Sequence, residues 1–132
     1  MTPAVIVATI VAGGGAAVVR HLVSLWVSRG RSPNEAAGFL WAVLVVNVVG
    51  SGLGGVVLAL AEQSSVSPEL QLVLLSGVCG GLTTFSTFSV ETIQLVHSGH
   101  WQRAGWNVAA NLTLGFAACV LGFVACGGMA FG

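Results

Sequence analysis

The chain has 132 residues, of which 55% are hydrophobic and only 6% are charged, and its mean hydropathy is +0.96. Ordinary soluble domains carry roughly a quarter of charged residues, so this composition excludes them and indicates an integral membrane protein. Four arginines balance four glutamates and lysine is absent. The sequence therefore offers no basic surface for nucleic acid and no polybasic run for acidic lipids.

Four apolar segments are long enough to cross a lipid bilayer, since a spanning helix needs about 20 residues. They cover residues 3–28, 36–61, 70–96 and 104–131, with short polar breaks between them. No positively charged region precedes the first segment, which is also longer than the apolar part of a signal peptide, so we expect it to be retained. The sequence predicts an all-α membrane protein, one domain over residues 1–132, with both termini on the same side.

The three cysteines give no sign of a metal or disulfide framework. Cys79, Cys119 and Cys126 all lie in apolar segments and form no CxxC or Cys/His pattern. We interpret them as small hydrophobic residues.

Two polar residues stand out in the first two segments. Arg20 lies about two turns inside the end of the first segment, where it either extends toward the nearer membrane surface or draws an anion into a vestibule. Asn47 in the second segment makes an interhelical hydrogen bond or lines a pore. Gly50 and Gly54 beyond it have the GxxxG spacing that allows close helix packing.

The third segment contains the polar run Gly80-Gly81-Leu82-Thr83-Thr84-Phe85-Ser86-Thr87-Phe88-Ser89. Polar groups at that depth usually mark a pathway or a site. Because two glycines precede two threonines, we expect this helix to break near its middle, which is tolerated only inside protein or beside water. The freed carbonyls suit a small cation, and the freed N–H groups and hydroxyls suit an anion.

Aromatic rings and hydroxyls alternate after the expected break. Phe85 and Phe88 share a face at helical spacing, with Thr84 and Thr87 beside them. The positive ring edges complement an anion that hydroxyls also contact, although aromatic pairs in membrane spans more often serve packing. Glu91, one turn further on, lies either near the membrane interface or at a pathway mouth.

The fourth segment carries one polar stripe, formed by Asn107, Asn111 and Gly115. Such a stripe faces protein or water, so it either contacts another helix or lines an ion path. The membrane-embedded polar groups are thus mostly neutral donors, and no acid lies at the centre of a span. Coupled proton exchange needs such an acid, so the residues favour passive conduction of a small ion, in particular an anion, through an oligomeric pore.

The motif run described above closely resembles the Fluc/CrcB family of fluoride channels. The resemblance extends over residues 77–92, Gly14-Gly15-Ala16 before Arg20, and Asn47-Val48-Val49-Gly50. It implies an antiparallel, dual-topology dimer with two pores, each built from both subunits, that passively exports fluoride across the bacterial plasma (inner) membrane.

The resemblance also implies roles for single residues. Phe85 and Phe88 would line the fluoride path and Asn47 would donate to the ion. The backbone carbonyls of Gly80 and Thr83 would hold a structural sodium ion at the dimer interface. The remaining positions implied are a hydroxyl track of Thr84, Ser86 and Thr87, a pore-end position at Glu91, and a vestibule arginine at Arg20.

The chain departs from the family in two respects. A tyrosine and serine stripe is common in the family on the fourth span, where this chain has Asn107 and Asn111, which we keep as candidates for the fluoride path. Arg29, Arg31 and Arg103 also fall on one side of the membrane, which favours a fixed orientation. A homodimer is expected, with one half of a heterodimeric pair as the alternative.

Three rival readings are weaker. A small four-span multidrug exporter would need an acid in the first span, and residues 3–28 contain none. An intramembrane hydrolase using Ser86 and His97 would have to join residues about 16 Å apart by helical rise. A non-conducting accessory subunit packed through its glycines would show no transport alone.

Overall fold

The computed structural model of the protein describes residues 2–27, 29 and 36–127. Most of the expected first loop and the expected end of the fourth span, residues 128–131, lie outside these residues. The described chain contains four helical segments long and apolar enough to cross a membrane: Pro3–Val27, Trp41–Glu62, Pro68–His97 and Trp101–Ala125. This all-helical architecture confirms the predicted fold class at that level, and the last span begins slightly earlier in the sequence than expected.

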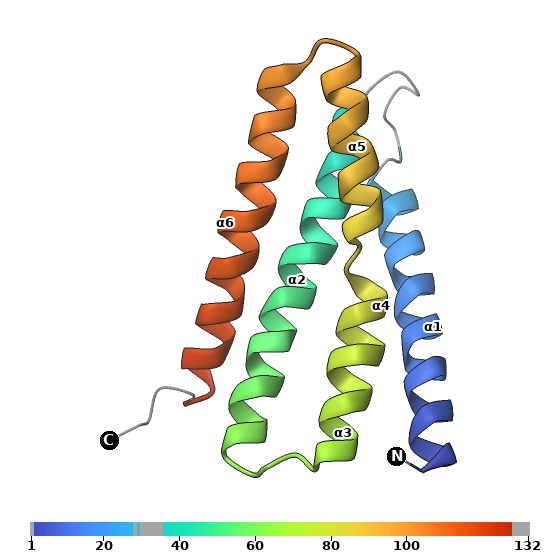
Figure 1. Cartoon of the computed structure of the whole chain (residues 1–132), viewed down its shortest axis with the longest axis vertical. Coiled ribbons are helices and arrows are strands. Elements are labelled where there is room, and N and C mark those ends of the chain that lie inside the picture. The colour runs from blue at the N-terminus through green and yellow to red at the C-terminus, as the bar shows by residue number, and fades with distance from the viewer. Residues whose placement is uncertain (1, 28, 30–35, 128–132) are drawn as a thin grey trace.

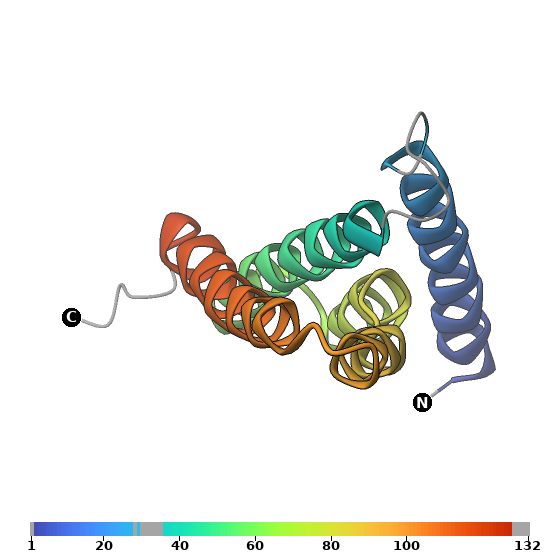
Figure 2. The same cartoon turned by 90° about the horizontal axis from the view of Figure 1, so that it is seen from above.

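The first, second and fourth spans are each a single long helix (Figure 1). They are α1 (Pro3–Val27), α2 (Ala36–Glu62) and α6 (Trp101–Ala125). Helix α1 begins and α6 ends at the same end of the bundle (Figure 1). Helix α2 makes its most extensive contact with α6 and also contacts α1, so it forms the centre of the subunit, as the view from above shows (Figure 2).

The third span is assembled from several pieces. It starts with α3 (Pro68–Leu72), where the Ser67 side chain caps the first turn, and continues through a π-helix, η1 (Val73–Cys79), and the short α4 (Gly80–Leu82). Thr83 and Thr84 then have extended backbone, with φ/ψ of −83°/156° and −149°/111°. Helix α5 (Phe85–His97) completes the span.

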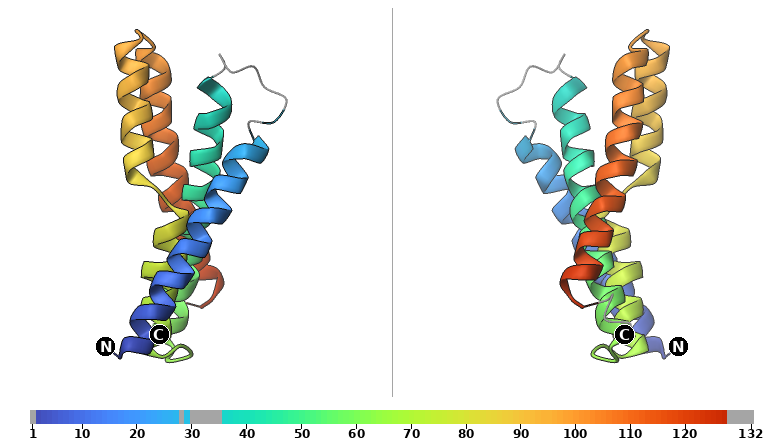
Figure 3. Two further views of the ribbon diagram at one scale, coloured as in Figure 1. Left: turned by 90° about the vertical axis from the view of Figure 1, so that its right-hand side faces the viewer. Right: turned by 90° about the vertical axis from the view of Figure 1, so that its left-hand side faces the viewer.

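The third span changes its neighbours at these two extended residues. Before them, η1 and α4 pack against α1, whereas after them α5 packs against α6 and α2. Figure 3 shows α5 leading away from α1 above this point. The two halves of the span therefore belong to different parts of the bundle, and the extended residues lie where these parts meet.

Glycines allow the helices to approach closely around this point. A Cβ atom at Gly81 would collide with the Gly13 carbonyl of α1, and one at Gly50 would collide with the Thr83 side chain. On the other side of α2, Gly55 lies directly against the Cys119 carbonyl of α6. Small residues thus bring α1 and α2 against the middle of the third span, as expected for close packing in membranes.

The outer helices bury few of their side chains. Within the described residues, Ala16 is the one fully buried residue of α1, and large apolar side chains such as Ile10 and Leu121 are about two-thirds exposed. Surfaces of this kind must be covered by lipid or by another protein surface. The chain is therefore an integral, multi-pass membrane protein.

Candidate functional site

The centre of the site is the hydrogen bond between Asn47 and Thr84. In a continuous helix the Thr84 N–H would donate to the Gly80 carbonyl. Here it donates to Asn47 Oδ1 on α2 at 2.9 Å, while the preceding Thr83 N–H keeps its helical bond to the Cys79 carbonyl. A side chain of α2 thus takes the place of the missing helical acceptor.

The Thr84 hydroxyl stabilises the restart of the helix. Its Oγ1 atom accepts a hydrogen bond from the Thr87 N–H at 3.3 Å and donates to Thr87 Oγ1 at 3.0 Å. Thr84 is therefore the N-cap of α5, and an N-cap threonine satisfies a donor that the first helical turn leaves unpaired. Its side chain is buried, so its hydrogen bonds lie away from bulk water.

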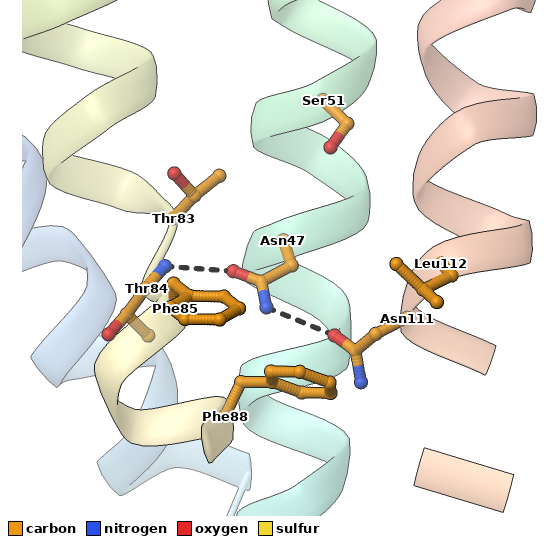
Figure 4. Close-up of a pocket in the computed structure, with 8 residues that line it drawn as sticks. All are labelled: Asn47, Ser51, Thr83, Thr84, Phe85, Phe88, Asn111 and Leu112. Carbon is orange, nitrogen blue, oxygen red and sulfur yellow. Dashed lines mark hydrogen bonds between the residues drawn. The ribbon is translucent and has the colours of Figure 1, made fainter. Parts of the chain in front are cut away.

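Thr83 and Thr84 form the junction between the two halves of the third span. A pocket of about 260 Å³ opens beside this junction. Figure 4 shows its lining, in which the Asn47 and Asn111 side chains approach each other beside the two phenylalanine rings. The centroids of the Phe85 and Phe88 rings lie 5.9 Å apart at an interplanar angle of 42°, and Phe85 is 80% exposed. The full lining is Asn47, Ser51, Thr83, Thr84, Phe85, Phe88, Asn111 and Leu112.

A second pocket, of about 280 Å³, lies on the α1 side of the same junction. Arg20 reaches it from α1, and its Nη1 atom donates to the Thr83 carbonyl at 3.4 Å. The guanidinium is thus held next to the extended residues by a long hydrogen bond. The pocket is lined by Arg20, His21, Ser24, Leu25, Val43, Thr84 and Thr87.

A third pocket, of about 510 Å³, contains Glu91. The Glu91 side chain is only 6% exposed, and its two carboxylate oxygens have no hydrogen-bond partner among the described residues. A buried carboxylate without partners is costly, so Glu91 is an unusual group at this position of α5. The other residues lining it are Ser86, Thr87, Val90 and Gln94.

Most of the predicted site residues thus line three pockets around the junction, and neighbouring pockets share a residue. The first two pockets share Thr84, and the second and third share Thr87. Asn107 lines none of the three but is joined to Asn111 by a hydrogen bond of 3.0 Å. Sequence reasoning missed Ser51, His21, Ser24 and Leu112, although Ser51 follows Asn47 by one helical turn and His21 adjoins Arg20.

Comparisons with known proteins give a consistent result. A sequence model of the family described as "CrcB-like protein, Camphor Resistance (CrcB)" matches residues 7–123. The chain is 44% identical over 107 residues to a "Fluoride-specific ion channel FluC" of Shewanella sp. (strain ANA-3), covering 80% of this chain and 83% of that protein. A protein of the same name from Shewanella loihica is 45% identical over 106 residues, covering 79% and 82% respectively.

The cap on α5 makes a prediction about stability. Replacing Thr84 by valine keeps the shape of the side chain but removes the acceptor for the Thr87 N–H, so we expect a loss of about 1 kcal/mol in the free energy of unfolding. Thr84→Ser retains the hydroxyl and should stay close to the parent protein. Unfolding of the purified protein in detergent, followed by circular dichroism, measures both. A Thr84→Val protein as stable as the parent would contradict the capping role.

Proposed function

The chain belongs to the CrcB family and is a fluoride channel, and we propose that fluoride passes the membrane along the three pockets that adjoin the extended residues Thr83 and Thr84. The family consists of channels and not enzymes, which removes the hydrolase reading. The observation that carries the proposal is the pocket in which Asn47, Phe85 and Phe88 converge. Passage is passive, so cytoplasmic fluoride leaves the cell down its own gradient.

The chemistry of the pockets suits a small anion. The Asn47 amide has two N–H groups, and one of them donates to Asn111 Oδ1 at 3.0 Å. The other has no partner in the described part of the chain and is available to fluoride, which as an anion accepts strong hydrogen bonds. The edges of the Phe85 and Phe88 rings carry partial positive charge and add to this attraction.

The shared lining residues suggest an order of events along the path. Arg20 attracts the anion electrostatically to the second pocket, where the Thr87 hydroxyl, which accepts from Thr84, donates to the anion and replaces part of its water. Fluoride then meets the Asn47 N–H and the phenylalanine ring edges. Neutral donors bind an anion without the deep trap that a free buried cation would create, as conduction requires. Ser86 and Glu91 form the pore-end part of the route.

A second subunit completes the path in this proposal. Phe85 is 80% exposed although it lines the first pocket. An exposed aromatic ring at this position favours an additional protein surface over α5. We take this to be a second copy in the antiparallel orientation, giving two pores at the interface, with a heterodimeric pair as the alternative.

Backbone carbonyls at the junction fit a structural sodium ion. Because the Thr84 N–H donates to Asn47, the Gly80 carbonyl loses its helical donor. Among the described residues, the Thr83 carbonyl accepts only the long bond from Arg20. Unwound backbone in membrane helices holds sodium through such oxygens. We propose that Gly80 and Thr83 of both subunits hold the ion, whose charge would join the two junctions across the interface.

The proposed path predicts the effect of two substitutions on flux. Phe85→Ile removes a ring edge and Asn47→Ala removes the amide donor, so each should lower fluoride efflux from liposomes by at least tenfold, about the effect of losing a charge-assisted hydrogen bond. A fluoride-selective electrode measures the rates. Phe116→Ile is a matched control, since Phe116 is a similarly exposed ring on α6 that lines none of the three pockets.

The folded state of each variant is checked by its elution as the same oligomer as the parent protein. If both site variants keep the parent flux, Phe85 and Asn47 do not lie on the path. Equal losses in the Phe116→Ile control would mean that the flux reports general packing and not the pocket.

The sodium proposal predicts a cation on the symmetry axis. A crystal grown with a heavier monovalent cation in place of sodium should show one anomalous peak within bonding distance of the Gly80 and Thr83 carbonyls. Replacing external sodium should also lower flux slowly, as the structural ion is lost. An empty position at these carbonyls, in crystals where the cation binds elsewhere, would contradict the assignment.

A further inference from the structure

A chain of hydrogen bonds runs from the start of α5 through α2 and α6 and returns to α5. It begins with the Thr84 N–H donating to Asn47 Oδ1 at 2.9 Å, and continues from Asn47 Nδ2 to Asn111 Oδ1 at 3.0 Å. Asn111 Nδ2 donates to Asn107 Oδ1 at 3.0 Å. Asn107 Nδ2 donates to Thr92 Oγ1 at 3.0 Å, and the Thr92 hydroxyl donates to the Phe88 carbonyl at 2.8 Å.

The two ends of this chain determine its direction. The Thr84 N–H can only donate, so Asn47 must present its oxygen to it and its NH₂ group to Asn111. The Phe88 carbonyl can only accept, so the Thr92 hydroxyl must donate to it and accept from Asn107. Both ends give the same direction. The orientation of each amide therefore follows from one group that can only donate and one that can only accept.

This direction leaves Asn111 without a donor for the pocket. Its Nδ2 atom contacts two acceptors on the same residue, the Asn107 carbonyl at 2.9 Å and the Asn107 Oδ1 atom at 3.0 Å. Asn107 itself is only 7% exposed and gives an N–H to Thr92. Asn111 lines the pocket, but the bonds it makes support Asn47 by offering an oxygen to the Asn47 NH₂ group.

Turning the Asn47 amide over would break this arrangement at two points. Its NH₂ group would face the Thr84 N–H, and its oxygen would face the oxygen of Asn111. Each clash leaves a buried group unsatisfied, which costs more than an ordinary hydrogen bond contributes. An inverted amide would also present an oxygen, which repels an anion.

We propose that Asn111, Asn107 and Thr92 are positioning residues, which hold the Asn47 amide so that its remaining N–H faces fluoride. The proposal rests on the function proposed above and adds the device that sets the orientation of its central donor. Thr92 is the informative member, because it lines none of the three pockets and acts through two intervening asparagines. Bonds in such chains polarise and strengthen one another, so a change at one end is felt at the other.

Removing the Thr92 hydroxyl, the last side-chain group in the chain of hydrogen bonds, tests the proposal through the rate of fluoride efflux. Thr92→Val keeps the side-chain shape and should slow fluoride efflux by about fivefold, the factor that corresponds to one ordinary hydrogen bond. Thr92→Ser retains the hydroxyl and should restore the parent rate. Thr9→Val is the matched control, since the Thr9 hydroxyl donates to the Val5 carbonyl one turn back, as Thr92 does to Phe88, but accepts from no side chain of the described residues.

Nuclear magnetic resonance of the asparagine side chains tests the positioning directly. The chain has four asparagines, Asn34, Asn47, Asn107 and Asn111, so protein labelled with ¹⁵N-asparagine in detergent gives a simple spectrum. Thr92→Val should shift the Asn111 and Asn47 amide signals before any fluoride is added. In the parent protein, added fluoride should move one of the two Asn47 amide protons more than those of Asn111.

Each outcome decides the proposal. Unchanged Asn47 signals in Thr92→Val, or parent flux in that variant, would overturn it. A larger fluoride shift at Asn111 than at Asn47 would make Asn111 a direct ligand and also overturn it. The amide shifts caused by Thr92→Val are measured without fluoride and do not depend on conduction. If the proposed function is wrong but the positioning is right, the parent protein will show no flux while these shifts remain. The fluoride titration uses only the parent protein. Its comparison of the Asn47 and Asn111 signals therefore tests the proposal even if Thr92→Val does not fold.

Discussion

The arrangement of the third span depends on one constraint: an N–H group released from a helix at membrane depth cannot face lipid and needs a hydrogen-bond partner. The Thr84 N–H meets this constraint by donating to Asn47 on α2. Because that bond replaces the helical one, the chain can be extended at Thr83 and Thr84, α5 can start again with Thr84 as its cap, and the span can pass from contact with α1 to contact with α6. The same exchange leaves the Gly80 carbonyl without its helical donor. One amide side chain thus supports the backbone, the pocket and the proposed ion path.

The balance of charge around the junction suits weak, selective binding better than tight capture. The nearest cation, Arg20, has its guanidinium turned toward the Thr83 carbonyl, which moderates its pull on an anion. The groups that line the first pocket are neutral amide, hydroxyl and aromatic side chains. A small anion that gives up its water needs short, well-directed donors. A larger anion would gain less from a single N–H and two ring edges, so we propose that the pocket favours fluoride over chloride through size and direction and not through net charge.

Much of this organisation is visible in the sequence, because it depends on local patterns. Apolar length predicts the four spans, and the glycine and threonine run identifies the segment where Thr84, Phe85 and Phe88 line one pocket. Asn47 had two alternative interpretations from sequence, and in the structure it both bonds to α6 and lines the pocket. The π-helix Val73–Cys79 has no compositional signature and was not expected. The bond from Asn107 to Thr92 and the burial of Glu91 depend on how α5 meets α6, which no spacing within one helix specifies. The roles proposed for single residues in ion passage stay predictions.

The central claim is that this chain forms a pore that passes fluoride and excludes chloride. The most direct test is efflux from liposomes that contain only this purified chain, with fluoride and chloride followed by ion-selective electrodes in the same preparation. The account predicts fast fluoride release, abolished in protein-free liposomes, with negligible chloride release. Equal release of both ions would contradict selectivity by the Asn47 pocket, and no release of either ion from folded protein would contradict a pore formed by this chain alone.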